Sequence, residues 1–216
     1  MPRDPGSKAS HPTLRDVRAR HPPFLDAVLE DARVTAANRG ERFKFRSKGD
    51  AILQALRLAW ASDAFLAQVA YRAKARLQAL GVPILPRLAH RFAMSLAQVS
   101  IGDPVVVHPG IYLVHGQVVI DGFVEIQTGT VITPFVTIGL RSPDFVGPTI
   151  GRRVRIGSGA KIIGPLRIGT GARIGANAVV LDDVPAHTTV VGAPARVVSP
   201  TRATGVQRPP DRVVPS

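Results

Sequence analysis

Cysteine is absent from the 216-residue sequence, and aromatic residues make up only 5% of it. The lack of cysteine excludes disulfides, thiolate zinc sites and cysteine nucleophiles. No apolar run has the length of a signal peptide or of a membrane span. We therefore expect a cytoplasmic protein whose core is built from aliphatic residues.

Basic residues exceed acidic residues by 13, but the excess is spread along the chain. The net charge is +5 over residues 1–48, +4 over 49–98, +2 over 99–198 and +2 over 199–216. Proteins that bind nucleic acids usually concentrate basic residues in one patch, often with aromatic residues for stacking. The sequence therefore predicts neither a nucleic-acid partner nor a membrane partner.

Composition and punctuation by proline and glycine divide the chain into four parts. They are a basic arm expected to be disordered (1–20), an α-helical region (21–98), a repeat region with a loop at 140–148 (99–198) and a tail expected to be disordered (199–216). Within the helical region we expect one helix to end near Gly40, the next to have Asp50 as its N-cap, and a third to lie between Ser62 and Gly81.

The repeat region has a period of six residues. In one phase, a branched aliphatic residue fills ten of eleven successive positions: Ile120, Ile126, Ile132, Ile138, Ile150, Ile156, Ile162, Ile168, Ile174 and Val180. Six matches neither the helical period near 3.6 nor the alternation of an amphipathic strand. Hexapeptide repeats are typical of a parallel β-helix, in which three short strands close one triangular coil. Asp144 alone breaks the phase, inside the loop.

Two segments carry a resemblance to a known family. The segment VPAHTTVVGAPARVV (184–198) is very similar to the closing segment of the serine acetyltransferases, and IGSGAKIIG (156–164) is similar to their central coils. From about residue 60 to 198 the chain thus resembles these members of the hexapeptide-repeat acyltransferases. The resemblance implies a left-handed β-helix, trimers or paired trimers, and acetyl-coenzyme A as co-substrate in the cleft between neighbouring β-helices, with no metal.

The resemblance also implies direct transfer of an acetyl group to a hydroxyl, which needs a general base because a hydroxyl is a poor nucleophile at neutral pH. The stretch GIYLVHG (110–116) falls on the catalytic segment of the family, and His115 takes the place of its catalytic histidine. On the acceptor side, Arg141 and Asp63 are candidates for binding the acceptor. On the coenzyme side the candidates are Gly139, Ser158, Lys161, Ala176 and Arg196.

Three acceptor-side positions depart from the family. Val114 and Ser100 stand where the family has aspartates, and Val146–Gly147–Pro148 replaces an Arg-His-Pro sequence that helps to hold the serine carboxylate. L-serine remains the leading acceptor, in which case the chain would serve cysteine biosynthesis. A sugar or another small alcohol is the alternative.

Two further classes of function stay open. A metal-dependent enzyme similar to the γ-class carbonic anhydrases would need three histidines, and only His108, His115 and His187 lie in the repeat region. A non-catalytic β-helix that serves as an assembly platform would need only the aliphatic positions. The retained GSGAK and GAPAR sequences favour the acyltransferase over this platform.

Overall fold

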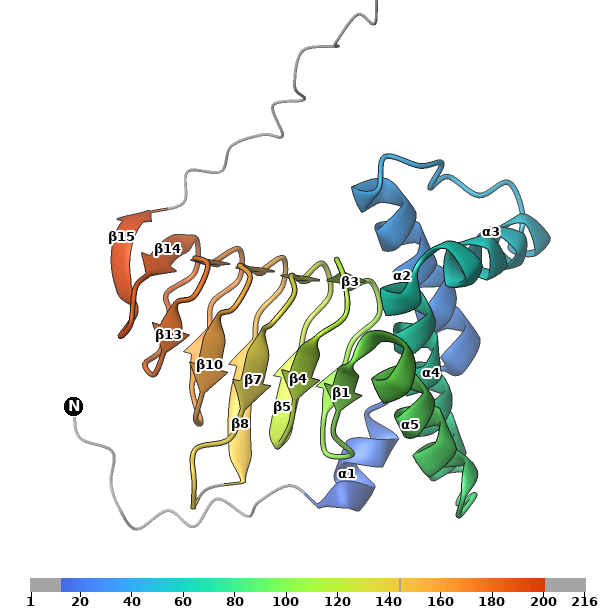
Figure 1. Cartoon of the computed structure of the whole chain (residues 1–216), viewed down its shortest axis with the longest axis horizontal. Coiled ribbons are helices and arrows are strands. Elements are labelled where there is room, and N and C mark those ends of the chain that lie inside the picture. The colour runs from blue at the N-terminus through green and yellow to red at the C-terminus, as the bar shows by residue number, and fades with distance from the viewer. Residues whose placement is uncertain (1–12, 144, 201–216) are drawn as a thin grey trace, which may run out of the picture.

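The structure, a computed structural model, describes residues 13–143 and 145–200. The predicted disorder of residues 1–12 and 201–216 therefore concerns segments outside the described residues. A helical region is followed by a solenoid of short strands, and the two lie end to end (Figure 1). No helix in the described part of the chain is long and apolar enough to cross a membrane.

The helices have clear starts and ends. They are α1 (Leu14–Ala19), α2 (Phe24–Asn38), α3 (Lys48–Ala61), α4 (Asp63–Ala79) and α5 (Leu85–Ala97). As predicted, α2 ends just before Gly40, and Ser62 caps α4 by accepting a hydrogen bond from the Phe65 amide at 3.3 Å. The predicted N-cap Asp50 is wrong. Ser47 caps α3 by accepting from the Asp50 amide at 3.2 Å, which places Asp50 in the first turn.

Part of the first twenty residues is ordered, because α1 lies within them. Thr13 and Asp16 form a capping box, in which the Thr13 hydroxyl accepts from the Asp16 amide and the Asp16 carboxylate accepts from the Thr13 amide at 2.9 Å. Val17, which is 2% exposed, buries the apolar side of this short helix. The prediction of disorder is therefore wrong for residues 14–19, and also for residues 199–200, which end β15 (Arg196–Pro200).

Fifteen strands in the described chain form three sheets, one on each face of the solenoid. The first sheet contains β1 (Val99–Ile101), β4 (Val118–Ile120), β7 (Thr137–Gly139), β10 (Lys161–Ile163) and β13 (Val179–Val180). The second contains β2 (Val106–Val107), β5 (Phe123–Ile126), β8 (Val146–Ile150) and β11 (Arg167–Ile168). The third contains β3 (Tyr112–Leu113), β6 (Val131–Ile132), β9 (Arg155–Ile156), β12 (Arg173–Ile174), β14 (Thr188–Val191) and β15 (Arg196–Pro200). We call these sheets A, B and C.

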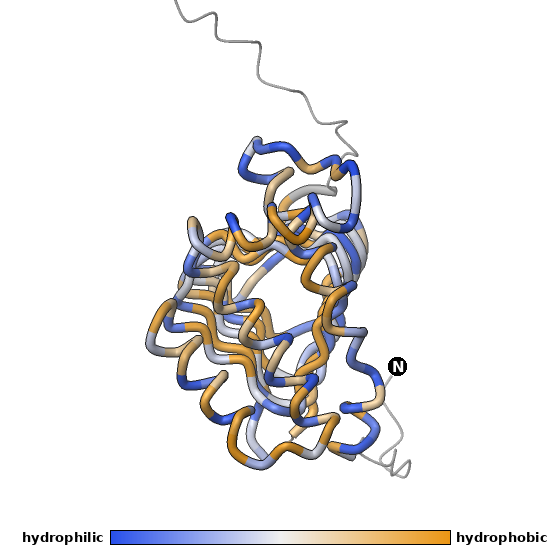
Figure 2. The backbone as a smooth tube through the Cα atoms, turned by 90° about the vertical axis from the view of Figure 1, so that its right-hand side faces the viewer, coloured by the Kyte–Doolittle hydropathy of each residue, from blue (hydrophilic) through white to orange (hydrophobic). Residues whose placement is uncertain are grey.

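Strand pairing is parallel within each sheet, except where β15 folds back antiparallel to β14. The chain visits A, B and C in turn, so each coil has three corners, which we call A–B, B–C and C–A. All ten aliphatic residues of the predicted phase are at most 3% exposed, which confirms the period of six. Figure 2 shows hydrophobic positions recurring side by side in successive coils. The prediction of a parallel β-helix is confirmed.

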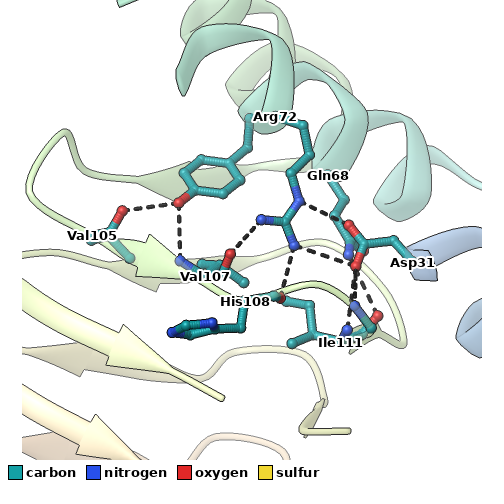
Figure 3. A network of polar contacts seen from close by, with 9 residues as sticks. Asp31, Gln68, Arg72, Val105, Val107, His108 and Ile111 are labelled. Atoms are coloured by element: carbon teal, nitrogen blue, oxygen red, sulfur yellow. Dashed lines mark hydrogen bonds and ion pairs between the residues drawn. The ribbon is translucent and has the colours of Figure 1, made fainter. Parts of the chain in front are cut away.

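A buried polar network joins the helices to the first coil (Figure 3). Arg72 on α4 donates to the Asp31 carboxylate, with Nε 2.9 Å from Oδ2, and to the carbonyls of Val107 and His108. The Gly110 amide also donates to Asp31, at 2.7 Å. Burial raises the pKa of Asp31, and Arg72 acts in the opposite direction. Because breaking a buried pair costs about 3–5 kcal/mol, this network fixes the helices on the solenoid.

Candidate active site

His115 lies in the one C–A corner that departs from the period of six. Core residues of sheets C and A are six positions apart in the later coils, as with Ile132 and Ile138, but Leu113 and Ile120 are seven apart. The extra residue falls in the corner 114–117, where His115 is exposed. This irregular corner is where the end of α5 meets the first coil.

The C-terminus of α5 holds the His115 corner in place. The Gln117 amide donates to the Ala97 carbonyl at 2.8 Å, and the Val118 amide donates to the Gln98 carbonyl at 3.2 Å. A Cβ on Gly116 would lie only 1.7 Å from the Ala97 oxygen, so glycine is required for this close approach. The helical region therefore fixes the backbone that follows His115, and on the other side the Val114 amide donates to the Ile132 carbonyl of the next coil at 3.0 Å.

An open pocket of about 430 Å³ lies beside His115. Its walls are the His115 corner and the ends of four helices: Arg39, Ala61–Ala64, Leu96–Gln98 and Val114–Gln117. The pocket thus contains the predicted base, His115, and one predicted acceptor-binding residue, Asp63. The His115 imidazole has no hydrogen-bond partner among the described residues, so its ring nitrogens are available to a substrate.

Ser158 and Ala176 occupy C–A corners of later coils, on the same edge as His115. Hydrogen bonds connect successive corners along this edge: the Phe135 amide donates to Gln117 at 2.8 Å, the Gly159 amide to Pro134 at 3.0 Å, and the Asn177 amide to Ser158 at 2.8 Å. Ser158 and Ala176 therefore lie one coil apart, as their spacing predicts. Their coenzyme-binding role stays a prediction.

Lys161 and Arg196 are the two basic candidates for coenzyme binding, and they differ in how many protein groups their charged ends already bond. The Lys161 ammonium group donates to the Phe135 carbonyl at 2.8 Å and to the Thr137 hydroxyl at 3.0 Å. Arg196, at the start of β15, is exposed and bonds only the adjacent Ala195 carbonyl among the described groups, at 2.9 Å. Of the two, Arg196 has the guanidinium that is free to meet a phosphate.

Gly139 and Arg141 lie at another edge of the solenoid. Gly139 ends β7 at an A–B corner, where its carbonyl accepts from the Gly164 amide at 2.9 Å. Arg141 lines a separate pocket of about 400 Å³ that also contains Asp182 and Asp183. One chain therefore brings Asp63 to His115 but does not bring Arg141 or Gly139 there.

The positions that depart from the family differ in their distance from the pocket. Val114 lines the pocket and is half-buried. Ser100 lies in β1, where it pairs with Val119 and does not bond His115. The structure leaves His115 without an orienting carboxylate from the described part of its own chain.

The three histidines of the carbonic-anhydrase alternative lie at different corners. His108 follows β2 and its Nε2 is 2.8 Å from Glu125 Oε1, while His187 lies at a B–C corner four coils away from it. Burial raises the pKa of Glu125, but the bonds from Arg20 and His108 outweigh this effect and hold that pKa below its usual value. Among the described residues no three potential ligands gather as a metal site.

Arg39 is the charged residue of the pocket lining that the sequence analysis did not identify. It is the C-cap of α2 and reaches the His115 corner only because α2 packs beside α4. Its sole sequence signal is its place directly before Gly40, which ends the helix. A separate signal in the sequence is the irregular spacing from Leu113 to Ile120, which marks the corner that contains His115.

Comparison with known proteins identifies the family of the chain. A family model described as bacterial transferase hexapeptide (six repeats) matches residues 147–182. The serine acetyltransferase of Helicobacter pylori strain J99 is 36% identical over 122 residues, which are 55% of this chain and 71% of that protein. The chain belongs to the serine acetyltransferase family. Its parallel β-helix is accordingly of the left-handed kind.

Other serine acetyltransferases match in sequence or structure. That of Mycobacterium tuberculosis strain H37Rv is 36% identical over 122 residues, and the chain spans only 53% of its length. The soybean serine acetyltransferase complexed with serine has a TM-score of 0.68 and 31% identity over 82% of this chain and 70% of that one. A serine acetyltransferase in complex with CoA has a TM-score of 0.68 and 25% identity, covering 85% and 73% of the two chains.

Proposed function

We propose that the chain transfers an acetyl group from acetyl-coenzyme A directly to the hydroxyl of L-serine. The observation that carries this proposal is the pocket at the irregular corner, where His115 and Asp63 face the same space. Ser158 and Ala176 follow on the same edge, and we propose that the extended coenzyme arm lies along this row of corners. Relatives with this fold that are named as complexes with serine and with CoA support the choice of both substrates.

In this reaction His115 acts as the general base. One imidazole nitrogen accepts the proton of the acceptor hydroxyl while the oxygen attacks the thioester carbonyl. The new C–O bond forms a tetrahedral intermediate, in which the former carbonyl oxygen carries the negative charge. The C–S bond then breaks, and the imidazolium returns the proton to the departing thiolate. Acetylated acceptor and free thiol leave a neutral histidine behind.

We propose that the complete site forms between copies in a trimer. Within one chain, His115 lies on the C–A edge, whereas Gly139 and Arg141 lie on the A–B edge. A closed threefold arrangement sets the C–A edge of each copy beside the A–B edge of the next, so each interface holds one complete site. Light scattering at micromolar concentration should give three, or a multiple of three, times the chain mass of 23.0 kDa. A monomer with full activity would contradict this assembly.

The substrate assignment is tested by thiol release from acetyl-coenzyme A with a panel of acceptors. We expect L-serine to support turnover better than sugars, small neutral alcohols or other amino acids, with O-acetylserine as the product identified by mass. A sugar that outperforms L-serine would replace the proposed acceptor. A protein that binds coenzyme A but acetylates none of the panel would favour the assembly platform.

A further inference from the structure

Two opposite charges face the pocket beside His115 from different helices. Arg39 ends α2 and Asp63 begins α4, and both line the pocket of about 430 Å³ that contains His115. Arg39 pairs with Glu41, and the described residues give Arg39 and Asp63 no ion pair with each other. A pocket that offers one cation and one anion, not paired together, is electrostatically complementary to a zwitterion.

Glu41, which lies outside the pocket lining, orients the Arg39 side chain. Gly40, with φ +73°, turns the chain after α2 so that Glu41 comes back beside Arg39. Arg39 Nε donates to Glu41 Oε1 at 2.8 Å, and this bond uses only one of the guanidinium nitrogens. The two terminal nitrogens have no protein partner among the described residues and form a fork that suits a carboxylate.

Asp63 is not needed to start its helix. Ser62 is the N-cap of α4 and accepts from the Phe65 amide at 3.3 Å, so the capping position is already filled. The Asp63 side chain is exposed and makes no ion pair with the described residues. Its carboxylate is therefore free to meet a cationic group in the pocket.

We propose that Arg39 binds the carboxylate of the amino-acid acceptor and Asp63 its ammonium group, with the acceptor hydroxyl beside His115. This inference rests on the proposed function and adds that one chain supplies the whole acceptor subsite. The loop residue Arg141, which lies on another edge, is then not required for the carboxylate. Arg39 is a specificity-determining residue in this account, because it selects acceptors that carry a carboxylate.

The test compares L-serine with ethanolamine, which lacks the carboxylate, and 3-hydroxypropionate, which lacks the ammonium group. Arg39→Gln should lower kcat/KM for L-serine roughly 10- to 100-fold, mainly through KM, and leave ethanolamine nearly unchanged. Asp63→Asn should lower L-serine use similarly and leave 3-hydroxypropionate nearly unchanged. Arg39→Lys should recover part of the L-serine activity, because the charge remains and the fork is lost.

Arg57→Gln is the matched control. Arg57 also contacts Glu41, with Nη1 3.2 Å from Oε2, but it does not line the pocket. It should leave L-serine kinetics unchanged. Equal losses with L-serine and ethanolamine in Arg39→Gln, or equal effects of the Arg39 and Arg57 variants, would assign Arg39 a structural role and overturn the inference.

Calorimetric binding of L-serine separates this inference from the proposed function. If the wild type acetylates L-serine and Arg39→Gln does so equally well, the inference is wrong and the function stands. If the wild type binds L-serine without acetylating it and Arg39→Gln loses that binding, the function is wrong and the subsite stands. A wild type that neither binds nor uses L-serine contradicts both.

Discussion

Val114 is the residue at which the pocket departs most plainly from the family resemblance. It lines the pocket beside His115 and offers no partner to a substrate ammonium group. Val114→Asp should raise kcat/KM for L-serine about two- to fivefold, the size of a partly exposed charge contact. The uncharged acceptor 1-propanol, assayed in parallel, should gain nothing. Equal changes with both acceptors would show that residue 114 does not meet the ammonium group.

Single residues also show where sequence reasoning succeeds and fails. His115 was predicted because its neighbours match a family segment without gaps, and the structure places it in a pocket. Arg39 was missed because its position depends on the packing of α2 against α4, about which its neighbours in the sequence say nothing. Asp50 was mistaken for the N-cap because both Ser47 and Asp50 are residue types that favour this position, and the helix begins after Ser47.

At the scale of one element, a substitution in the β-helix can test the assigned six-residue repeat. Ile162 is fully buried in β10, and Arg167 at the start of β11 is exposed. Ile162→Asp buries an unpaired carboxylate, which costs several kcal/mol, comparable with the stability of a whole domain. We expect this variant to lose the folded β-helix, whereas Arg167→Asp should melt within a few degrees of the wild type. Circular dichroism during thermal unfolding compares the two.

A folded Ile162→Asp protein with the melting temperature of the wild type would contradict the assigned phase.

The same phase explains which parts of the β-helix could be predicted from the sequence. Each coil repeats one simple pattern of burial, so the period predicted the buried strand positions and the break between Ile138 and Ile150. The predicted loop 140–148 is too long at its end, because β8 already begins at Val146. The first coil was less visible, because the extra residue in the His115 corner shifts the phase between Leu113 and Ile120.

His21 links the stability of the whole molecule to pH. Its pKa is lowered to about 4, mainly by burial and further by the positive charges of Arg72 and Lys74. The buried Nδ1 has no hydrogen-bond partner among the described residues. The unfolded chain, with a histidine pKa near 6.5, therefore binds more protons between pH 4 and 6.5. The free energy of unfolding should fall by roughly 1–3 kcal/mol as pH decreases through this window, after allowance for partial exposure.

Urea unfolding between pH 4.5 and 7.5 measures this slope. His21→Phe keeps a ring beside Tyr71 but removes the titrating group, so its stability should depend less on pH than that of the wild type. His187→Asn is the control, because His187 is exposed and lies at φ +56°, which asparagine tolerates. If His21→Phe and the wild type lose stability in parallel, another group carries the pH dependence.

At the scale of the assembled protein, the central claim is that His115 activates the acceptor for acetyl transfer. The most direct measurement is thiol release from acetyl-coenzyme A with saturating L-serine, on wild type and His115→Ala of equal oligomeric state and equal coenzyme affinity. General-base catalysis contributes about a hundred- to ten-thousand-fold. The account predicts that kcat falls by at least about a hundredfold in His115→Ala. A folded, coenzyme-binding His115→Ala protein with a turnover near that of the wild type would contradict it.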